Sequence, residues 1–539
     1  IFAVPQALTR SSPGTLATLA TGHRHLRRRG PGAVLAVMAV AFAAGFGWLS
    51  WRQQSNFGIF GFDLGIHDQA IWLASTGHRM FDTVRGLDYF GENVNLISLA
   101  FVPLYWLGAG PHLLVLFNAA VLAAGALPLW LITRDRIVNR WAALVVPGAY
   151  LLYPSLGYLA WWGFHPDSFT VTPLLFAWWF AMRRRWVPFA ACVLLALAAK
   201  EDAALAVLGM GLAIAWWRHF EAAPGTSVAR RPAHSRRPTY SSRRAYRRAG
   251  LVAAAGAVVW FELCTKVIIP GNNGGAAPFY SSYFPAFGTT PLEVAYNAVR
   301  HPSRSWHVAQ LATRRTYYFQ MLAPVGFLAL LALPALLVGL PQLLVNVADQ
   351  AEGLSFTSQY GTLVMVGVFV ATAEALGVVR RRLPALVGPA LALLAATTLA
   401  STLAWGITPA GSRFHTWWRA SDPVAAQLGH ALSLVPVRAG VSVTYDLTTH
   451  VTHRVDAFEF PNPWIDVNWL SKTVPERPAA VSWIVVDGAV LDDTSRVLLD
   501  HLTSPGGGFH VVYQRSGVEV ATRDLLSGPS GHSGRPVVQ

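Results

Sequence analysis

Charged residues are scarce in this sequence. Asp, Glu, Lys and Arg together make up 13% of its 539 residues, whereas an ordinary soluble domain contains about 25%. A water-soluble fold could not hide the 53% of residues that are hydrophobic, and the mean hydropathy is +0.39. The scarcity of charge therefore excludes an ordinary soluble protein and indicates one whose surface faces lipid.

Cysteine is rare, and the common catalytic signatures are missing. The two cysteines, Cys192 and Cys264, lie in apolar runs and predict neither a disulfide framework nor a metal-thiolate site. The sequence contains no Walker loop, dinucleotide-binding fingerprint, HExxH motif or Ser-His-Asp signature. Primary ATP-driven transport by this chain alone is therefore not expected.

Acidic residues are fewer than basic ones, 27 against 42, which leaves a net charge of +15. Such an excess can indicate a nucleic-acid-binding protein, but no recognition motif accompanies it. The basic clusters instead fall between apolar runs, at 24–29, 134–140, 183–185, 230–248 and 380–382. Because short loops with this charge stay on the cytoplasmic side of a membrane, we expect membrane lipid as a partner and no nucleic acid.

Apolar runs recur along most of the chain. A spanning helix needs about 20 mostly apolar residues, and the runs between residues 33 and 406 predict roughly nine to eleven such helices. The predicted fold is mainly α: a polytopic α-helical membrane protein with a small external α/β domain at its C-terminus. Either residues 324–347 then enter the membrane and return, with a break at Leu333-Pro334, or one of the loop assignments on either side is wrong.

These patterns divide the chain into four parts. Residues 1–32 form a basic cytoplasmic tail; residues 33–406 form a multi-pass transmembrane domain with external loops 52–95 and 270–320 and an Arg-rich cytoplasmic loop 218–249. Residues 407–526 have soluble composition, with strand-like runs at 441–445 and 481–486, and are expected to form an external domain. Residues 527–539 are rich in Gly, Ser and Pro and are expected to be disordered. The predicted location is the plasma membrane.

Polar residues that break the apolar pattern gather on the expected external side. Asp63 starts a short helical run, where it could act as a general base, bind a divalent cation, or cap the helix. Glu92, Asn93 and Asn95 could complete a site with Asp63 or cap the next helix. His165 and Asp167, in a short Pro-containing segment, could shuttle protons or simply form a turn.

Further candidates lie deeper in the chain. Lys200-Glu201-Asp202 interrupts a long apolar stretch, which indicates either a functional group near membrane depth or a hairpin tip at the outer surface. Between residues 270 and 320, aromatic and basic residues are interleaved, and arginine suits bidentate contact with phosphate. Interfacial anchoring is the alternative for this segment. The candidates there and beyond are Arg304, Arg314, Arg315 and Tyr360.

Several short motifs occur in order along residues 50–500. They are Phe62-Asp63-Leu64-Gly65-Ile66-His67-Asp68-Gln69-Ala70-Ile71-Trp72, Pro103-Leu104-Tyr105, Phe164-His165-Pro166-Asp167, Lys200-Glu201-Asp202, Pro341-Gln342-Leu343-Leu344-Val345-Asn346 and Gln359-Tyr360. In this order they resemble a bacterial family of predicted membrane proteins, domain of unknown function 2079. That family is distantly similar to the GT-C glycosyltransferases.

The resemblance implies a chemistry. GT-C enzymes use a polyprenyl-phosphate-linked sugar as donor and keep an acidic residue in the first external loop as a base or metal ligand, which implies Asp63 as the catalytic residue. The substrate-binding candidates are Asp68, Glu92, Asn93, His165, Asp167, Lys200, Glu201, Arg304, Arg314, Arg315 and Tyr360. Where many relatives carry a His-Phe-Ser-Pro-like stretch, this chain has Asn93-Val94-Asn95-Leu96, a departure that bears on donor binding or metal coordination.

The sequence therefore predicts a membrane glycosyltransferase that passes a sugar from a polyprenyl-phosphate donor to an external acceptor. One alternative is a transporter or flippase of a lipid-linked envelope precursor, in which Lys200, Glu201 and His165 line the pathway. Another is a non-catalytic envelope scaffold. The metal requirement stays open, with a divalent cation as the one cofactor considered.

Overall fold

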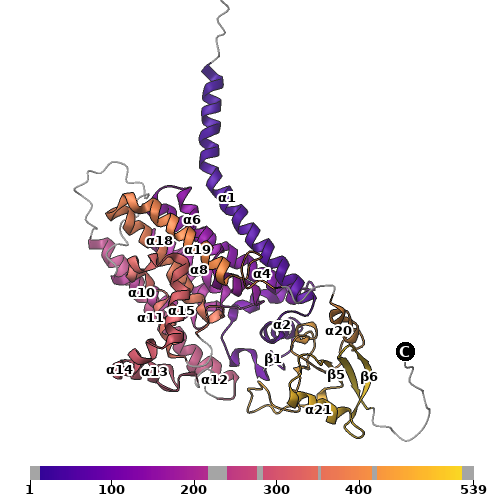
Figure 1. Ribbon diagram of the computed structural model, residues 1–539. Helices are drawn as coiled ribbons and strands as arrows, with labels where there is room; N and C mark the ends of the chain where they lie inside the picture. Colours follow the sequence, from indigo (N-terminus) through magenta and orange to yellow (C-terminus); the bar gives the residue numbers. More distant parts are fainter. Residues whose placement is uncertain (1–12, 217–239, 276–282, 350–353, 416–421, 525–539) are drawn as a thin grey trace, which may run out of the picture.

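A computed structural model describes residues 13–216, 240–275, 283–349, 354–415 and 422–524. A bundle of helices makes up most of it, and the strand-containing C-terminal region lies against one end of the bundle (Figure 1). The predicted mainly α membrane fold with a small α/β region at the C-terminus is confirmed. The tail 527–539 and most of the loop 218–249 lie outside the described residues.

Apolar helices of two kinds build the bundle. Among the described residues, five are long and apolar enough to cross a membrane, and two further spans are bent pairs. The long ones are Gly30–Ser55 within α1 (Pro13–Ser55), Pro111–Ile137 (α4, Pro111–Ala124, with α5, Ala126–Ile137), Arg243–Asn272 (α11, Tyr240–Leu263, continuing to α12, Ile269–Asn272), Gln359–Arg382 (α18, Thr362–Arg382) and Pro384–Trp405 (α19, Val387–Trp405). The bent pairs are Ala142–Leu151 with Pro154–Trp161, and Ala312–Val325 with Leu328–Leu336. The shorter apolar helices are Leu96–Tyr105, α8 (Ser168–Met182), α9 (Trp186–Ala199) and α10 (Ala203–Trp216).

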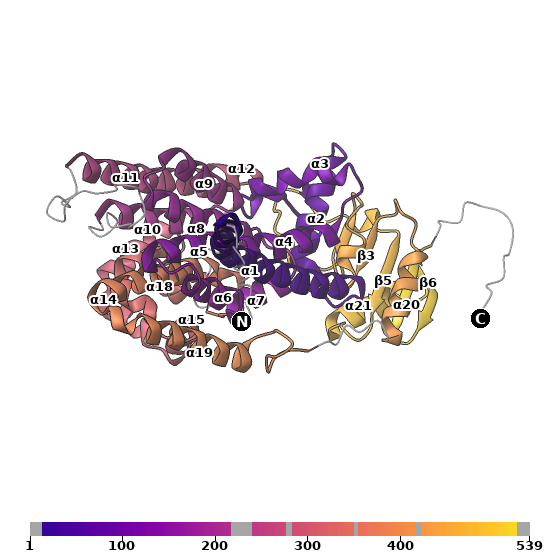
Figure 2. The ribbon, with the colours of Figure 1, turned by 90° about the horizontal axis from the view of Figure 1, so that it is seen from above.

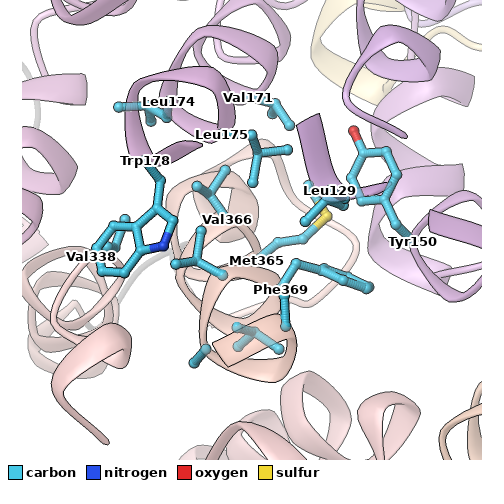
Figure 3. Packing of buried hydrophobic residues seen from close by; sticks show 14 of the residues in the cluster. Leu129, Tyr150, Val171, Leu174, Leu175, Trp178, Val338, Met365, Val366 and Phe369 are labelled. Carbon is cyan, nitrogen blue, oxygen red and sulfur yellow. The ribbon is translucent and has the colours of Figure 1, made fainter. Parts of the chain in front are cut away.

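Helix α18 forms the centre of the bundle. The most apolar part of this helix is 94% buried within the protein, against 28% for α1, α11 and α19. Figure 3 shows Val366 and Phe369 of α18 packed among Leu129, Tyr150 and Trp178 from three other helices. A helix that is apolar all round needs such enclosure. The other long helices leave a face uncovered, as expected for contact with lipid.

The segment before α18 is broken, as expected, but at a different place. Ala312–Val325 and Leu328–Leu336 meet at 86°. Gly326 and Phe327 at this bend have φ of +58° and +56°, in the left-handed region that ends a helix. At Leu333-Pro334, where the break was predicted, a helical turn begins instead, because proline is well tolerated in a first turn. The helix α17 (Leu340–Ala348) then returns toward α18.

The C-terminal region contains a mixed five-stranded sheet in the order β4-β3-β5-β7-β6. Strands β3 (Val441–Val443), β4 (Ala457–Glu459) and β5 (Trp483–Asp487) are parallel, and β6 (Phe509–Arg515) with β7 (Val518–Arg523) adds an antiparallel hairpin. Helices α20 (Pro423–Ser433) and α21 (Asp493–Thr503) pack against it. Strands β3 and β5 are buried on both faces, as is usual for parallel strands covered on each side.

Helix α2 (Gly61–Ser75) lies between the bundle and the sheet (Figure 2). The segment that follows β3 packs directly on it, and two glycines of α2 permit this approach. A Cβ on Gly61 would lie 2.1 Å from the carbonyl oxygen of Tyr445, and one on Gly65 would lie 2.8 Å from Thr448. Gln54 of α1 and Thr449 are joined by hydrogen bonds of 2.7 and 3.0 Å. The C-terminal region is therefore tightly docked on α1 and α2.

Candidate functional site

A cavity of about 940 Å³ opens beside α2. One end is polar and the other apolar. Its polar lining comprises Asp63, His67, Glu92, Asn93, Asn95, His165, Asp167, Lys200, Glu201, Asp202, Gln342, Asn346, Asp349, Gln359 and Tyr360. The structure thus gathers residues from sequence positions 63 to 360 around one space. A large, mostly apolar cavity with a few convergent polar groups is typical of a ligand site.

Asp63 lies in the first turn of α2, at the edge of this cavity. The N-cap position is occupied by Phe60, which makes no side-chain cap bond, so Asp63 does not cap the helix in the predicted way. Within the described residues, its carboxylate has neither a hydrogen bond nor an ion pair. Asp63 is thus an available base.

Lys200 is the centre of the polar end. Helix α9 ends at Ala199 and α10 begins at Ala203, so the three ionisable residues occupy the turn between two apolar helices. Lys200 Nζ lies 3.1 Å from both oxygens of Asp167 and 3.6 Å from Asp202 Oδ2. The ring of Tyr360 lies 5.5 Å from the same ammonium. The buried ammonium is therefore fully paired, as burial of a charge requires.

Glu201 links this turn to the segment after α2. It is 2% exposed, and its Oε2 accepts a hydrogen bond of 2.8 Å from the backbone N–H of Val94. The bond brings Asn93 and Asn95 to the cavity wall. His165 lies in the wall too, and its backbone N–H donates to Asn118 Oδ1 at 3.4 Å. Glu201, Asn93 and His165 therefore join Lys200 at this end.

His67 is a site residue that the list of sequence candidates omits. Burial, followed by the charges of His165 and Lys200, lowers the pKa of His67 to about 3. The imidazole is therefore neutral, and its Nδ1 lies 2.7 Å from the Tyr89 hydroxyl, which donates to Ser98. The signal was its spacing: His67 follows Asp63 by four residues, which places both on one face of a helix.

Two acidic candidates turn out to be engaged elsewhere. Glu92 lines the cavity but is paired with Arg85, with two N–O distances of 2.8 Å. Asp68 is fully buried away from the cavity lining, where it accepts hydrogen bonds from the hydroxyls of Tyr105 and Thr452. Asp68 thus holds elements together at the interface between α2 and the C-terminal region.

The three candidate arginines lie outside the cavity lining, and each guanidinium binds backbone carbonyls. Arg304 donates to Ala286 O at 2.9 Å, and Arg315 to Gln310 O at 2.8 Å. Arg314 donates to Asp349 O at 2.8 Å. Within the described residues, Lys200 is the one lysine or arginine of the lining. Their N–H donors are thus used by backbone carbonyls, and amino-acid composition cannot show this.

The apolar end of the cavity opens between surface helices. α13 (Pro291–Arg300) and α14 (Pro302–Ala309) contribute Val294, Val299 and Trp306, and α17 contributes Leu344. Val299, Trp306 and Leu344 are largely exposed. Short amphipathic helices with exposed apolar residues are typical of the membrane interface. An apolar chain could therefore enter the cavity from the lipid side.

The described residues contain no group of three or more His, Cys, Asp or Glu side chains that could hold a metal ion. A divalent cation at Asp63 would accordingly depend on oxygens brought by a ligand, as Mg²⁺ commonly does with phosphates.

Comparison with known proteins gives one match. No curated protein matches the chain. The model of the family described as Predicted membrane protein (DUF2079) covers residues 17–520, which include the cavity, α2 and nearly all of the C-terminal sheet. The chain therefore belongs to the DUF2079 family of predicted membrane proteins.

Proposed function

We propose that the protein transfers a sugar from a polyprenyl-phosphate-linked donor to an acceptor outside the cytoplasm, with Asp63 as the catalytic base. One observation carries the proposal: an unpaired carboxylate at the end of a helix faces a cavity that is polar beside it and apolar toward lipid. A lipid-linked sugar has this same division between head and tail.

Few residues take part in the transfer step. Asp63 takes the proton of an acceptor hydroxyl, whose oxygen forms a bond to the anomeric carbon while the bond from that carbon to the phosphate oxygen breaks. The lipid phosphate leaves with the electron pair. Lys200 and His165 face the space where this charge develops and replace the predicted arginines as its partners. Neutral His67 orients groups near Asp63 rather than supplying charge.

The location belongs to the same proposal. We place the protein in the plasma membrane, with loops 52–95 and 270–320 and the domain 407–526 outside and the basic residues 1–32 and 218–249 inside. The positive-inside distribution supports this orientation. The docked C-terminal region would then lie where an acceptor glycan arrives.

The test compares two acid-to-amide variants in reconstituted vesicles with labelled polyprenyl-phosphate sugars. Asp63→Asn should abolish transfer and leave expression and membrane insertion unchanged. Asp88→Asn is the matched control, because Asp88 is in the same segment but pairs with the exposed Arg79. Full transfer by Asp63→Asn would exclude this mechanism.

Translocation is the second candidate, because Lys200, Glu201 and His165 line one cavity as a pathway would require. Labelled lipid-linked sugar that crosses the vesicle membrane without transfer would favour a flippase. Binding without either event would favour a scaffold.

A further inference from the structure

The polar end of the cavity holds more carboxyl groups than basic groups. Its lining holds one lysine, Lys200, and no arginine among the described residues. The carboxylates of the lining are Asp63, Glu92, Asp167, Glu201, Asp202 and Asp349. Arg85 neutralises Glu92, and Lys200 is shared between Asp167 and Asp202. No described cation lies within ion-pairing distance of Asp63 or Glu201, so the cavity has a surplus of acid.

Two buried amide oxygens flank the same turn without a partner. Asn95 is 3% exposed and Gln342 is 4% exposed, and both residues line the cavity. Among the described residues, Asn95 Oδ1 and Gln342 Oε1 have no hydrogen-bond partner. The preceding Val94 is bonded to Glu201, which places Asn95 beside the turn. Buried acceptors without donors are costly. A ligand that supplies donors would remove that cost.

The orientation of Gln342 follows from its neighbours. Asn346 Nδ2 donates to the carbonyl oxygen of Tyr360 at 2.9 Å, so Asn346 Oδ1 must be an acceptor. Gln342 Nε2 donates to that Oδ1 at 2.7 Å. Gln342 Oε1 is therefore the free atom. Tyr360 in turn lies over Lys200, so this acceptor belongs to the polar end.

Side chains of the described residues do not form a metal site by themselves, because no three His, Cys, Asp or Glu side chains converge. The acceptors are instead spread around the turn. An ammonium carries three donors and one positive charge, and on a sugar it stands beside further hydroxyl donors. Such a group satisfies dispersed carboxylates and amide oxygens together.

We propose that the polar end of the cavity binds a head group that carries an ammonium, as an amino sugar does, with Glu201, Asp202, Asn95 and Gln342 as its acceptors. The inference rests on the proposed function for the identity of the ligand as the donor sugar. Lys200 remains beside the donor phosphate, and the ammonium offsets the surplus acid. The bound head group is then close to neutral overall.

The experiment measures binding of glucosamine, glucose and glucose 1-phosphate to the purified full-length chain in an uncharged detergent by isothermal titration at a pH where the amine is protonated. Glucosamine should bind about tenfold tighter than glucose, since a charge-assisted hydrogen bond is exchanged for a neutral one. Glu201→Gln keeps an acceptor for Val94 and should reduce the preference to near unity. Asp456→Asn removes an acid in the C-terminal region that pairs with Arg477, and should leave it unchanged.

Equal binding of glucosamine and glucose, or tighter binding of glucose 1-phosphate, would overturn the inference. So would an unchanged preference in Glu201→Gln. Asp202→Asn gives the same readout if Glu201→Gln does not fold. Transfer of neutral sugars without any preference for the amine would contradict this inference and leave the proposed function standing. A preference for the amine without transfer from any donor would support this inference and contradict the proposed function.

Discussion

The carboxylate of Asp68 accepts a hydrogen bond from the hydroxyl of Thr452, although 384 residues separate them in the chain. Asp68 lies on the same helix as Asp63, and Thr452 follows the first strand of the C-terminal sheet. His453 Nε2 lies 3.3 Å from the same carboxylate. The C-terminal region therefore positions the helix that carries the proposed base.

Replacement of Asp68 should loosen this contact. Asp68→Ala leaves the buried hydroxyls of Thr452 and Tyr105 without their acceptor, and we expect a loss of about 2–4 kcal/mol in the free energy of unfolding. Thermal unfolding and limited proteolysis of the C-terminal region would measure it. Asp68→Asn keeps one acceptor oxygen and should cost less. Unchanged protease resistance in Asp68→Ala would contradict a positioning role.

A methyl group at Gly61 should separate the same surfaces. The added Cβ would meet the carbonyl oxygen of Tyr445, a backbone atom that cannot turn away. Gly61→Ala should therefore lower the unfolding temperature and expose the C-terminal region to protease. Gly256→Ala on α11 is the control, because its Cβ meets nothing within 4 Å. If both variants behaved alike, the close approach would not matter.

Stability should fall as pH rises through the range of Glu459. Burial, and then the charge of Asp63, raises the pKa of Glu459 from 4.5 to about 8, and its Oε2 has no partner. A carboxyl group whose pKa is higher in the folded state than in the unfolded state stabilises the fold fully below its unfolded-state pKa. This stabilisation is lost as the pH rises from about 4.5 to about 8. The loss is on the order of 5 kcal/mol. In Glu459→Gln the unfolding temperature should depend less on pH across this range. A pH dependence identical to that of the unaltered protein would refute the role of Glu459.

Cysteine labelling should establish the orientation. With Cys192 and Cys264 replaced, single cysteines at His78 and Arg515 should react with a membrane-impermeant maleimide on intact cells, because both lie on the expected outer side. A cysteine at Arg247 should react only after permeabilisation, since basic segments stay in the cytoplasm. Labelling of position 247 but not 78 on intact cells would place the cavity on the wrong side.

Local pattern was enough for much of the fold. Runs of apolar residues predicted the helices, and strand-like runs separated by Pro, Gly and Asp predicted strands β3 and β5. The break before α18 was misplaced: proline at 334 suggested it, but the bend needed the left-handed residues at 326 and 327. Backbone conformation at single residues depends on their neighbours in space.

Part of the site was visible as polar residues in apolar surroundings. Asp63, His165, Lys200 and Glu201 were identified in this way, since a charge beside apolar runs needs a partner or water. The arginines 304, 314 and 315 looked equally suitable, yet their donors serve backbone carbonyls. The hydrogen-bond partners of each side chain, which only the folded chain shows, separated the two groups.

The amino-acid sequence by itself determined that this chain lives in a membrane, which segments are helical, and which polar residues stand out. Only the tertiary structure decided that α2, the turn at 200–202 and α17 surround one cavity, and that Asp68 serves the C-terminal region instead. The reason is physical: hydrophobic periodicity is a property of neighbouring residues, whereas a cavity and its charge balance exist only after distant segments pack.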